Sequence, residues 1–146
     1  MTFQLPAVLS ETRDDFLDLS ESDRLQLLLE FSQDLPALPA KYSEHPELLE
    51  RVEECQSPVY IFVDVNDDST VSVYATAPEQ SPTTRGFASI LVQGLSGLSV
   101  DEALSIPADF PDTLGLTKLI SPLRVRGMTA MLWRIKRQIK DKSGAL

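Results

Sequence analysis

Hydrophobic residues recur with helical spacing in two long stretches of the chain. In the first, apolar or small residues stand at i, i+3, i+4, i+7, i+8 and i+11, which predicts a core helix. These positions are Phe87, Ile90, Leu91, Gly94, Leu95 and Leu98. Ser81-Pro82 is a typical helix start before this stripe, and Gly97 favours an end just after it.

The second stretch predicts a helix from Ser121-Pro122 to about Lys140. Its apolar positions are spaced 3, 4, 3 and 4, which gives one buried stripe. The stripe consists of Val125, Met128, Leu132, Ile135 and Ile139. Trp133 falls about 130° from the centre of this stripe at 100° per residue. We therefore expect Trp133 to be partly exposed or to pack against another element.

Weaker helical signals occupy the N-terminal part of the chain. Residues 10–19 are expected to form a short acidic helix after a loosely held segment, residues 1–9. Ser20 to Asp23 is close to a capping box and opens a second helix, which Pro36 ends. The apolar stripe of this second helix is expected to comprise Leu25, Leu28, Leu29, Ser32 and Leu35. Further short helical segments are expected at 46–49 and from Ser99 to about Ile106.

Strand patterns occupy the middle of the chain. Residues 59–65 and 71–77 alternate between apolar and other positions, and the segment 66–69 between them has turn chemistry. The two runs predict an antiparallel hairpin, which is marginal alone and needs a third strand or covering helices. A third strand is expected just before or around Cys55. The fold class is therefore α+β, one domain over residues 1–146 with helices covering one face of a small antiparallel sheet.

The composition excludes several classes of protein. The 146 residues contain one Cys and one His, so neither an internal disulfide nor a Cys/His zinc site within the chain is available. We see no apolar run of membrane-spanning length and no signal peptide, and a lone free thiol suits a reducing cytoplasm. The chain therefore reads as cytoplasmic, with no membrane partner.

Charge is distributed unevenly along the chain. The formal net charge is −9, but residues 118–146 carry eight bases and one acid, whereas residues 1–117 carry 21 acids and five bases. An acidic body argues against nucleic acid as a partner. The basic tail is best interpreted as the solvated face of the last helix, with cations suited to the helix C-terminus.

Cys55 is the first candidate for chemistry. It lies where a Glu-rich segment gives way to the first strand, and a thiolate is a nucleophile. The adjacent Glu53 and Glu54 disfavour the thiolate, and Pro58 restricts the exit from the loop. From these residues alone, two interpretations stay open: a small buried hydrophobic residue, or a nucleophile that needs activation from outside.

Other candidate groups are weaker. His45 is the sole histidine and is more simply an exposed loop residue than a base for Cys55. Asp64, Asp67 and Asp68 lack the twelve-residue calcium pattern and fit a polar hairpin tip. No glycine-rich phosphate loop is present, and no metal site is expected.

Arg85 and Arg124 each stand near the start of a predicted helix, where a cation opposes the helix dipole. An unfavourable position of this kind indicates that each arginine has a structural or functional role that offsets the cost. Each arginine either pairs with the acidic body or directs its guanidinium toward the thiolate, a persulfide or a partner carboxylate.

Five segments in matching order resemble the SufE family of sulfur-acceptor proteins. The segment 54–60, Glu-Cys-Gln-Ser-Pro-Val-Tyr, resembles that family's Gly-Cys-Gln-Ser-Gln-Val-Trp. The segment 35–39 resembles its Leu-Pro-x-Leu, and 85–91 resembles its basic-Gly-Leu helix start. The segments 114–116 and 119–128 resemble its Leu-x-x-x-Leu-Ser-Pro-x-Arg-x-x-Gly-hydrophobic block. The similarity spans residues 20–140, with Glu54, Pro58 and Tyr60 as departures.

The resemblance implies a SufE/IscU-like α+β fold and a specific chemistry. Cys55 would take persulfide sulfur from a cysteine desulfurase, stimulate that enzyme and relay the sulfur to an iron–sulfur scaffold. Gln56, Ser57, Arg124 and, less directly, Arg85 would support it. The resemblance implies no cofactor in this chain, since pyridoxal phosphate belongs to the desulfurase. It also implies that the protein is an accessory protein and not a stand-alone enzyme.

Two alternatives remain beside sulfur transfer. One is a non-catalytic adaptor of the desulfurase in which Cys55 is structural. The other is a scaffold that binds the cluster itself, which one Cys and one His make difficult without a shared dimer site.

Overall fold

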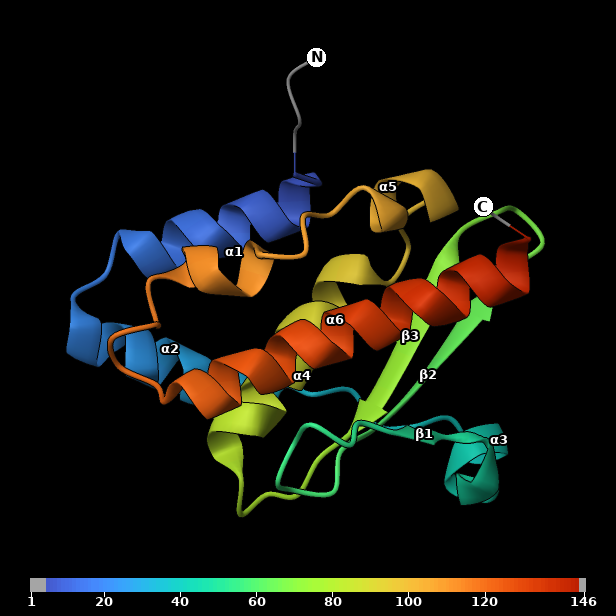
Figure 1. The fold of residues 1–146 in the computed structure, drawn as a ribbon, viewed down its shortest axis with the longest axis horizontal. Coiled ribbons are helices and arrows are strands. Elements are labelled where there is room, and N and C mark those ends of the chain that lie inside the picture. The colour runs from blue at the N-terminus through green and yellow to red at the C-terminus, as the bar shows by residue number, and fades with distance from the viewer. Residues whose placement is uncertain (1–4, 145–146) are drawn as a thin grey trace.

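The computed structural model describes residues 5–144, which form six α-helices, two 3-10 helices and a three-stranded sheet (Figure 1). The elements in chain order are α1 Ala7–Leu17, α2 Glu21–Gln33, α3 Ala40–Ser43, η1 Pro46–Leu48, β1 Glu50–Arg51, β2 Tyr60–Val65, β3 Val71–Thr76, α4 Pro82–Leu95, α5 Val100–Leu104, η2 Phe110–Leu114 and α6 Pro122–Ser143. The order of helices and strands confirms the predicted α+β class.

The sheet has the strand order β1-β2-β3, and both pairings are antiparallel. In the hairpin, Ile61 lies opposite Ala75 and Val63 opposite Val73, so the apolar positions of both strands share one face. These four side chains are buried. The predicted third strand is the two-residue β1, which directly precedes the segment carrying Cys55.

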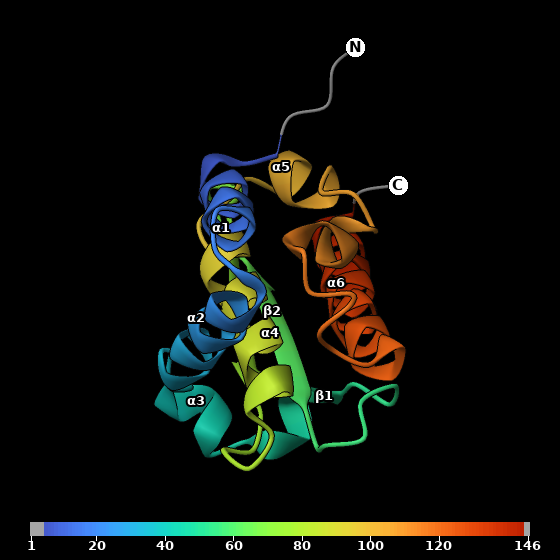
Figure 2. The ribbon, with the colours of Figure 1, turned by 90° about the vertical axis from the view of Figure 1, so that its left-hand side faces the viewer.

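The two long helices pack against this apolar face. α4 lies against β3, with α2 behind it, while α6 runs along β2 (Figures 1 and 2). The opposite face is partly covered by Tyr42 of α3, whose ring centroid lies 4.3 Å from that of Phe62 and 5.1 Å from that of Tyr74. The close approach of α2 to α4 needs Gly86, where a Cβ atom would lie 2.6 Å from the carbonyl oxygen of Leu28.

Side chains of α6 replace the strand that β1 is too short to provide. Beyond Ile61, the free edge of β2 would leave backbone groups unpaired. Gln138 Oε1 accepts the Val63 N–H at 2.9 Å, and Lys142 Nζ donates to the Val63 carbonyl at 2.5 Å. Lys142 also lies 3.6 Å from the centroid of the Phe62 ring. The last helix is thus fixed to the sheet by polar contacts as well as by its apolar stripe.

The stripe predicted for α6 is confirmed: Val125, Met128, Leu132, Ile135 and Ile139 are all buried. Trp133, on a different side of the helix, is 58% exposed, as its angular position predicted. Over residues 5–144, none of the helices has the length and apolar character needed to cross a bilayer.

Three local predictions were wrong. α1 begins at Ala7 and Leu9 is fully buried, so the end of the segment predicted to be loosely held is part of the core; residues 1–4 lie outside the described part. On α2, Leu25 and Leu29 are partly exposed, because only the side of the helix carrying Leu28 faces α4. Ser81 makes no side-chain cap at α4.

Candidate functional site

Cys55 lies in a short loop, residues 52–59, that connects β1 to β2 and extends toward α6 (Figure 2). The Val52 N–H donates to the Val59 carbonyl at 2.9 Å, and both valines are fully buried. The Cys55 N–H donates to the Val52 carbonyl at 3.1 Å. These bonds close the base of the loop and hold the cysteine against the body of the protein.

A glycine of α6 covers the thiol. A Cβ atom at Gly127 would lie 3.1 Å from the Cys55 Sγ, inside the roughly 3.5–4.0 Å at which nonbonded carbon atoms pack. The helix backbone can therefore approach the sulfur this closely only because position 127 has no side chain. Cys55 is 7% exposed.

A small pocket of about 140 Å³ opens beside the buried thiol. It is lined by the loop residues Cys55, Gln56 and Ser57 together with Arg124 of α6 and the start of α4. Sequence analysis grouped these four residues, and the fold brings them together around one cavity.

The expected cap residue of α4 is used to hold this loop. The hydroxyl of Ser81 lies 2.5 Å from that of Ser57 and shares a hydrogen bond with it. Ser81 thus joins the start of α4 to the cysteine loop, which accounts for its missing cap.

Arg85 does not reach the pocket. Its Nε donates to the Ser32 carbonyl at 2.8 Å, and its Nη1 donates to the Ala77 carbonyl at 2.6 Å. The guanidinium therefore ties the end of α2 to the residue that follows β3. Within residues 5–144, Arg85 therefore forms no ion pair with the acidic body and does not line the cysteine pocket. A role toward a partner carboxylate stays a prediction.

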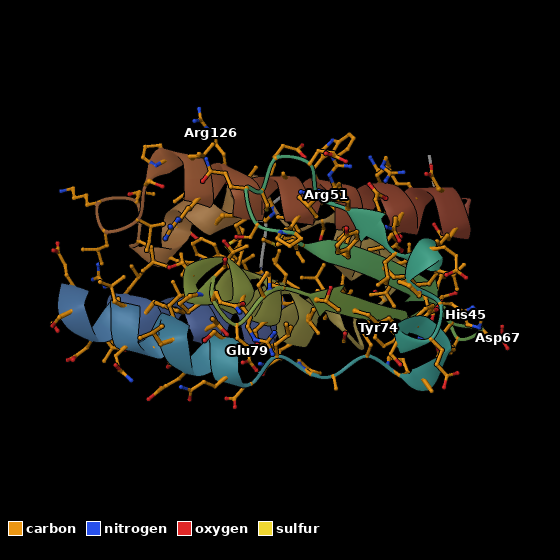
Figure 3. All side chains as sticks on the ribbon, turned by 90° about the horizontal axis from the view of Figure 1, so that it is seen from below. His45, Arg51, Asp67, Tyr74, Glu79 and Arg126 are labelled. Atoms are coloured by element: carbon orange, nitrogen blue, oxygen red, sulfur yellow. The ribbon has the colours of Figure 1, made fainter. Side chains whose placement is uncertain are left out.

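The other candidate groups lie away from the thiol. His45 pairs with Glu47 at 3.0 Å on the surface. In Figure 3, His45 and Asp67 both lie toward the end of the molecule that is remote from Arg126. Asp64 is bound by Lys41 and Tyr42, and Asp68 by Thr70. Within residues 5–144, no group of three or more His, Cys, Asp or Glu side chains is placed to hold a metal ion.

The surroundings of Cys55 keep its thiol protonated. Burial, with a smaller contribution from the Glu54 carboxylate, raises the pKa of Cys55 to about 11, while the Arg134 cation acts in the opposite direction. Sequence analysis predicted the direction of the Glu54 effect but not the larger contribution of burial. At neutral pH the free protein therefore carries an unreactive thiol.

Arg134 is a site residue that sequence reasoning missed. It donates to Glu54 at 2.6 and 3.2 Å and to Glu50 at 2.7 Å, so it ties the cysteine loop and β1 to α6. Glu50 also accepts from Gln138 at 3.0 Å and from Arg137. No motif connects Glu54 with a residue 80 positions later, and only the charge excess of the last helix hinted at such a partner.

We expect the Arg134→Met variant to be less stable than the wild type by about 1–2 kcal/mol at neutral pH, because two carboxylates lose a half-buried partner. Burial by itself would raise the pKa of Glu50, but hydrogen bonds from Arg134, Arg137 and Gln138 hold it below its usual value; Arg134 likewise lowers the pKa of Glu54. Groups with lowered pKa stabilise the fold above their unfolded-state pKa and lose this contribution as the pH falls.

Denaturant titrations of both proteins across the acid range test this expectation. The stability gap should narrow as the pH falls below about 4.5. Arg126→Met, which removes an exposed arginine from the same helix, serves as the control and should change little. If the difference in unfolding free energy between the two proteins stayed the same at acid pH, the Glu50 and Glu54 carboxylates would be excluded as its source.

Comparison with known proteins supports an assignment to a family. Residues 10–139 match the SufE model, described as an Fe-S metabolism associated domain. An uncharacterized SufE-like protein of Mycobacterium tuberculosis is 50% identical over 137 residues, which cover 94% of each chain. The cysteine desulfuration protein SufE of Plasmodium vivax is 28% identical over 124 residues, covering 77% of this chain and 51% of the relative.

A solved structure gives the same result for the fold. The solution structure of a hypothetical protein from Thermus thermophilus superposes with a TM-score of 0.83 at 33% identity, covering 97% of this chain and 99% of the other. The region that matches the family model, residues 10–139, contains the cysteine loop, the whole sheet, α4, and α6 as far as Ile139. The chain therefore belongs to the SufE family, whose domain is associated with Fe–S metabolism.

Proposed function

We propose that this protein accepts sulfur from a cysteine desulfurase onto Cys55 and relays it to iron–sulfur cluster assembly. The observation that carries the proposal is the single cysteine of the chain, held on an anchored loop beside a pocket of about 140 Å³. The name of the Plasmodium vivax relative, cysteine desulfuration protein SufE, supports the same class of reaction. A lone thiol can carry sulfane sulfur but supplies too few ligands to hold a cluster.

The transfer is a thiol exchange. The Cys55 thiolate attacks the outer sulfur of the donor's persulfide, a new S–S bond forms, and the donor's S–S bond breaks. The donor cysteine leaves as a thiolate and takes up the proton that Cys55 released. No external oxidant or reductant is consumed, and the pyridoxal phosphate that generates the donor persulfide belongs to the desulfurase.

The raised pKa of Cys55 supports a reaction that depends on docking. Exchange requires a thiolate and access to it, and the free protein offers neither. A desulfurase that displaces the loop from Gly127 would hydrate the sulfur and lower its pKa toward the usual range. Stimulation of the desulfurase follows, because its persulfide is removed only in the complex.

Arg124 of α6 lines the pocket and brings a cation to it. In the free protein Arg134 is the cation that acts to lower the pKa of Cys55. Once docking opens the loop, the positive charge of Arg124 would favour a thiolate before transfer and a persulfide anion after it. Once the loop closes again, the persulfide is sheltered from stray oxidants and reductants until an iron–sulfur scaffold receives the sulfur. Such chemistry fits a reducing cytoplasm.

A non-catalytic adaptor is the second candidate. The burial of Cys55 under Gly127 favours it, because a well-packed cysteine is often a small hydrophobic residue without chemistry. In that case the protein would stimulate a desulfurase through contact alone.

Intact mass spectrometry separates the two candidates. The protein is mixed with a cysteine desulfurase, cysteine and pyridoxal phosphate, and a gain of one sulfur, about 32 Da, that dithiothreitol removes is expected for the wild type. Cys55→Ser should show no gain and should lose the stimulation of the desulfurase. An adaptor would instead stimulate equally well with or without this substitution and would gain no sulfur in either form.

A further inference from the structure

The outward face of α6 carries a stripe that the core does not use. Arg126, Trp133 and Lys140 are exposed and spaced by seven residues, which places them along one side of the helix. Figure 3 shows Arg126 projecting away from the body of the protein on this helix. Trp133 is 58% exposed and is the one tryptophan of the chain. An aromatic side chain of this size in water is typical of a contact surface.

The surface around Trp133 is hollowed. A depression of about 380 Å³ lies between α6 and the segment that follows α5, with Trp133 and Ala108 in its lining. Three cations and one acid also line it, and the Arg137 guanidinium lies 5.8 Å from the indole centroid. These are Lys136, Arg137, Lys140 and Asp141. The hollow thus combines apolar side chains with an excess of cations, which suits a ligand that is both apolar and acidic.

The charge of this face is not explained by the fold alone. Cations stabilise the last turn of a helix, but Arg126 stands near the N-terminus of α6, where the dipole opposes it. Lys136 donates to the Ile106 carbonyl, and burial, with the charge of Lys140, lowers its pKa. Arg137 is paired with Glu50 and, at 3.4 Å, with Asp141, whereas neither Lys136 nor Lys140 forms an ion pair within residues 5–144. Carboxylates from outside would stabilise these two cations, of which Lys136 is partly desolvated.

This face is separate from the cysteine pocket. Gly127 covers the thiol, and Trp133 follows six residues later, about 120° away around the helix at 100° per residue. Arg134, the next residue, points to Glu54 of the cysteine loop instead. One partner can therefore occupy the pocket while another segment lies on the Trp133 face.

We propose that this face of α6 is a docking surface for an acidic segment of a partner protein. An apolar side chain of that segment lies on the Trp133 indole, and its carboxylates pair with Lys136 and Lys140. The remainder of the chain, residues 1–117, has 21 acids and five bases and would repel such a segment, so it is directed to α6. The surface operates whether or not Cys55 carries sulfur.

Trp133 fluorescence tests this surface directly, because every change in emission comes from one position. The probes are two short synthetic peptides with the same central pair of leucines, one flanked by glutamates and one by lysines. We expect the acidic peptide to cause a saturable blue shift in the intact protein and the basic peptide to cause none. Raising the salt concentration from about 0.05 to about 0.5 M should weaken the binding of the acidic peptide at least about fivefold.

The Lys136→Glu/Lys140→Glu variant should bind the acidic peptide at least about tenfold more weakly, in line with the loss and reversal of two charges. Its Cys55 alkylation rate should equal that of the wild type, which shows that the fold and the cysteine pocket are intact. Absence of a saturable shift in the wild type, equal binding of both peptides, or tighter binding of a single-stranded oligonucleotide would each overturn the proposal. None of these outcomes depends on sulfur transfer.

Discussion

Iodoacetamide is expected to alkylate Cys55 in the native protein at least about 20-fold more slowly than in the unfolded chain at about pH 8. A pKa of about 11 leaves about 200-fold less thiolate at this pH than the ordinary pKa near 8.5. The more basic thiolate is intrinsically more nucleophilic, which recovers about a factor of ten. Burial at 7% exposure then slows access further, so the estimate is a lower limit.

The pH profile identifies the cause. Because the folded-state pKa is raised, the native rate should keep climbing with pH up to about 11, whereas the rate in about 6 M guanidinium should level off just above its ordinary pKa. Glu54→Gln removes one of the two causes and should shift the native profile toward lower pH without abolishing the difference. A native profile that levels off near the ordinary thiol pKa of about 8.5 would contradict a raised pKa and leave steric shielding as the whole effect.

Periodicity predicted the parts of the fold that bury apolar side chains. The stripe of α6, the stripe of α4 from Phe87 to Leu95 and the alternation of β2 and β3 were correct, because each buried set repeats with the period of its element. Leu98, predicted to continue the α4 stripe, lies beyond the end of that helix and is only partly buried. Leu25 and Leu29 were misplaced, since a helical stripe shows which side is apolar and not how much of it another element covers. The start of α1 was missed because no cap residue marks it: Pro6 precedes the helix without a side-chain hydrogen bond.

The candidate site was predictable where its residues are neighbours in sequence or belong to one motif. Cys55, Gln56 and Ser57 are consecutive, and Arg124 belongs to the block that opens α6. Arg134 and its pairing with Glu54 were not predictable, because any of the several arginines of the last helix would have satisfied the same charge pattern. The contacts of Arg85 were not predictable either, because a cation at a helix start indicates that a partner exists but not which one, and here two backbone carbonyls accept its hydrogen bonds.

Gly127→Val is expected to raise the alkylation rate of Cys55 at least about tenfold, the opposite direction from added steric protection. The valine Cβ would stand 3.1 Å from the sulfur, and its two methyl groups would extend further. α6 is fixed by its buried stripe and by Gln138 and Lys142 at the sheet edge, so it resists displacement. The loop yields instead, water reaches the thiol, and the pKa of Cys55 falls toward its ordinary value.

Two controls separate this effect from general loosening of the helix. Thr129→Val places the same β-branched residue in α6 away from the thiol and should leave the alkylation rate within about twofold of the wild type. Thermal unfolding of Gly127→Val should remain cooperative, because only the cysteine loop has moved. A slower alkylation rate in Gly127→Val would show that the helix accommodates the side chain and closes the pocket more tightly.

The same variant connects the cover over the thiol with sulfur storage. If closure under Gly127 shelters a persulfide on Cys55, the variant should still be loaded by a desulfurase but should lose its sulfur to dithiothreitol faster than the wild type, as followed by the decay of the mass gain. Equal decay in both proteins would mean that the closed loop protects the free thiol and not the persulfide. In that case glycine is needed at position 127 for packing alone, and the persulfide is protected only in the complex with the partner.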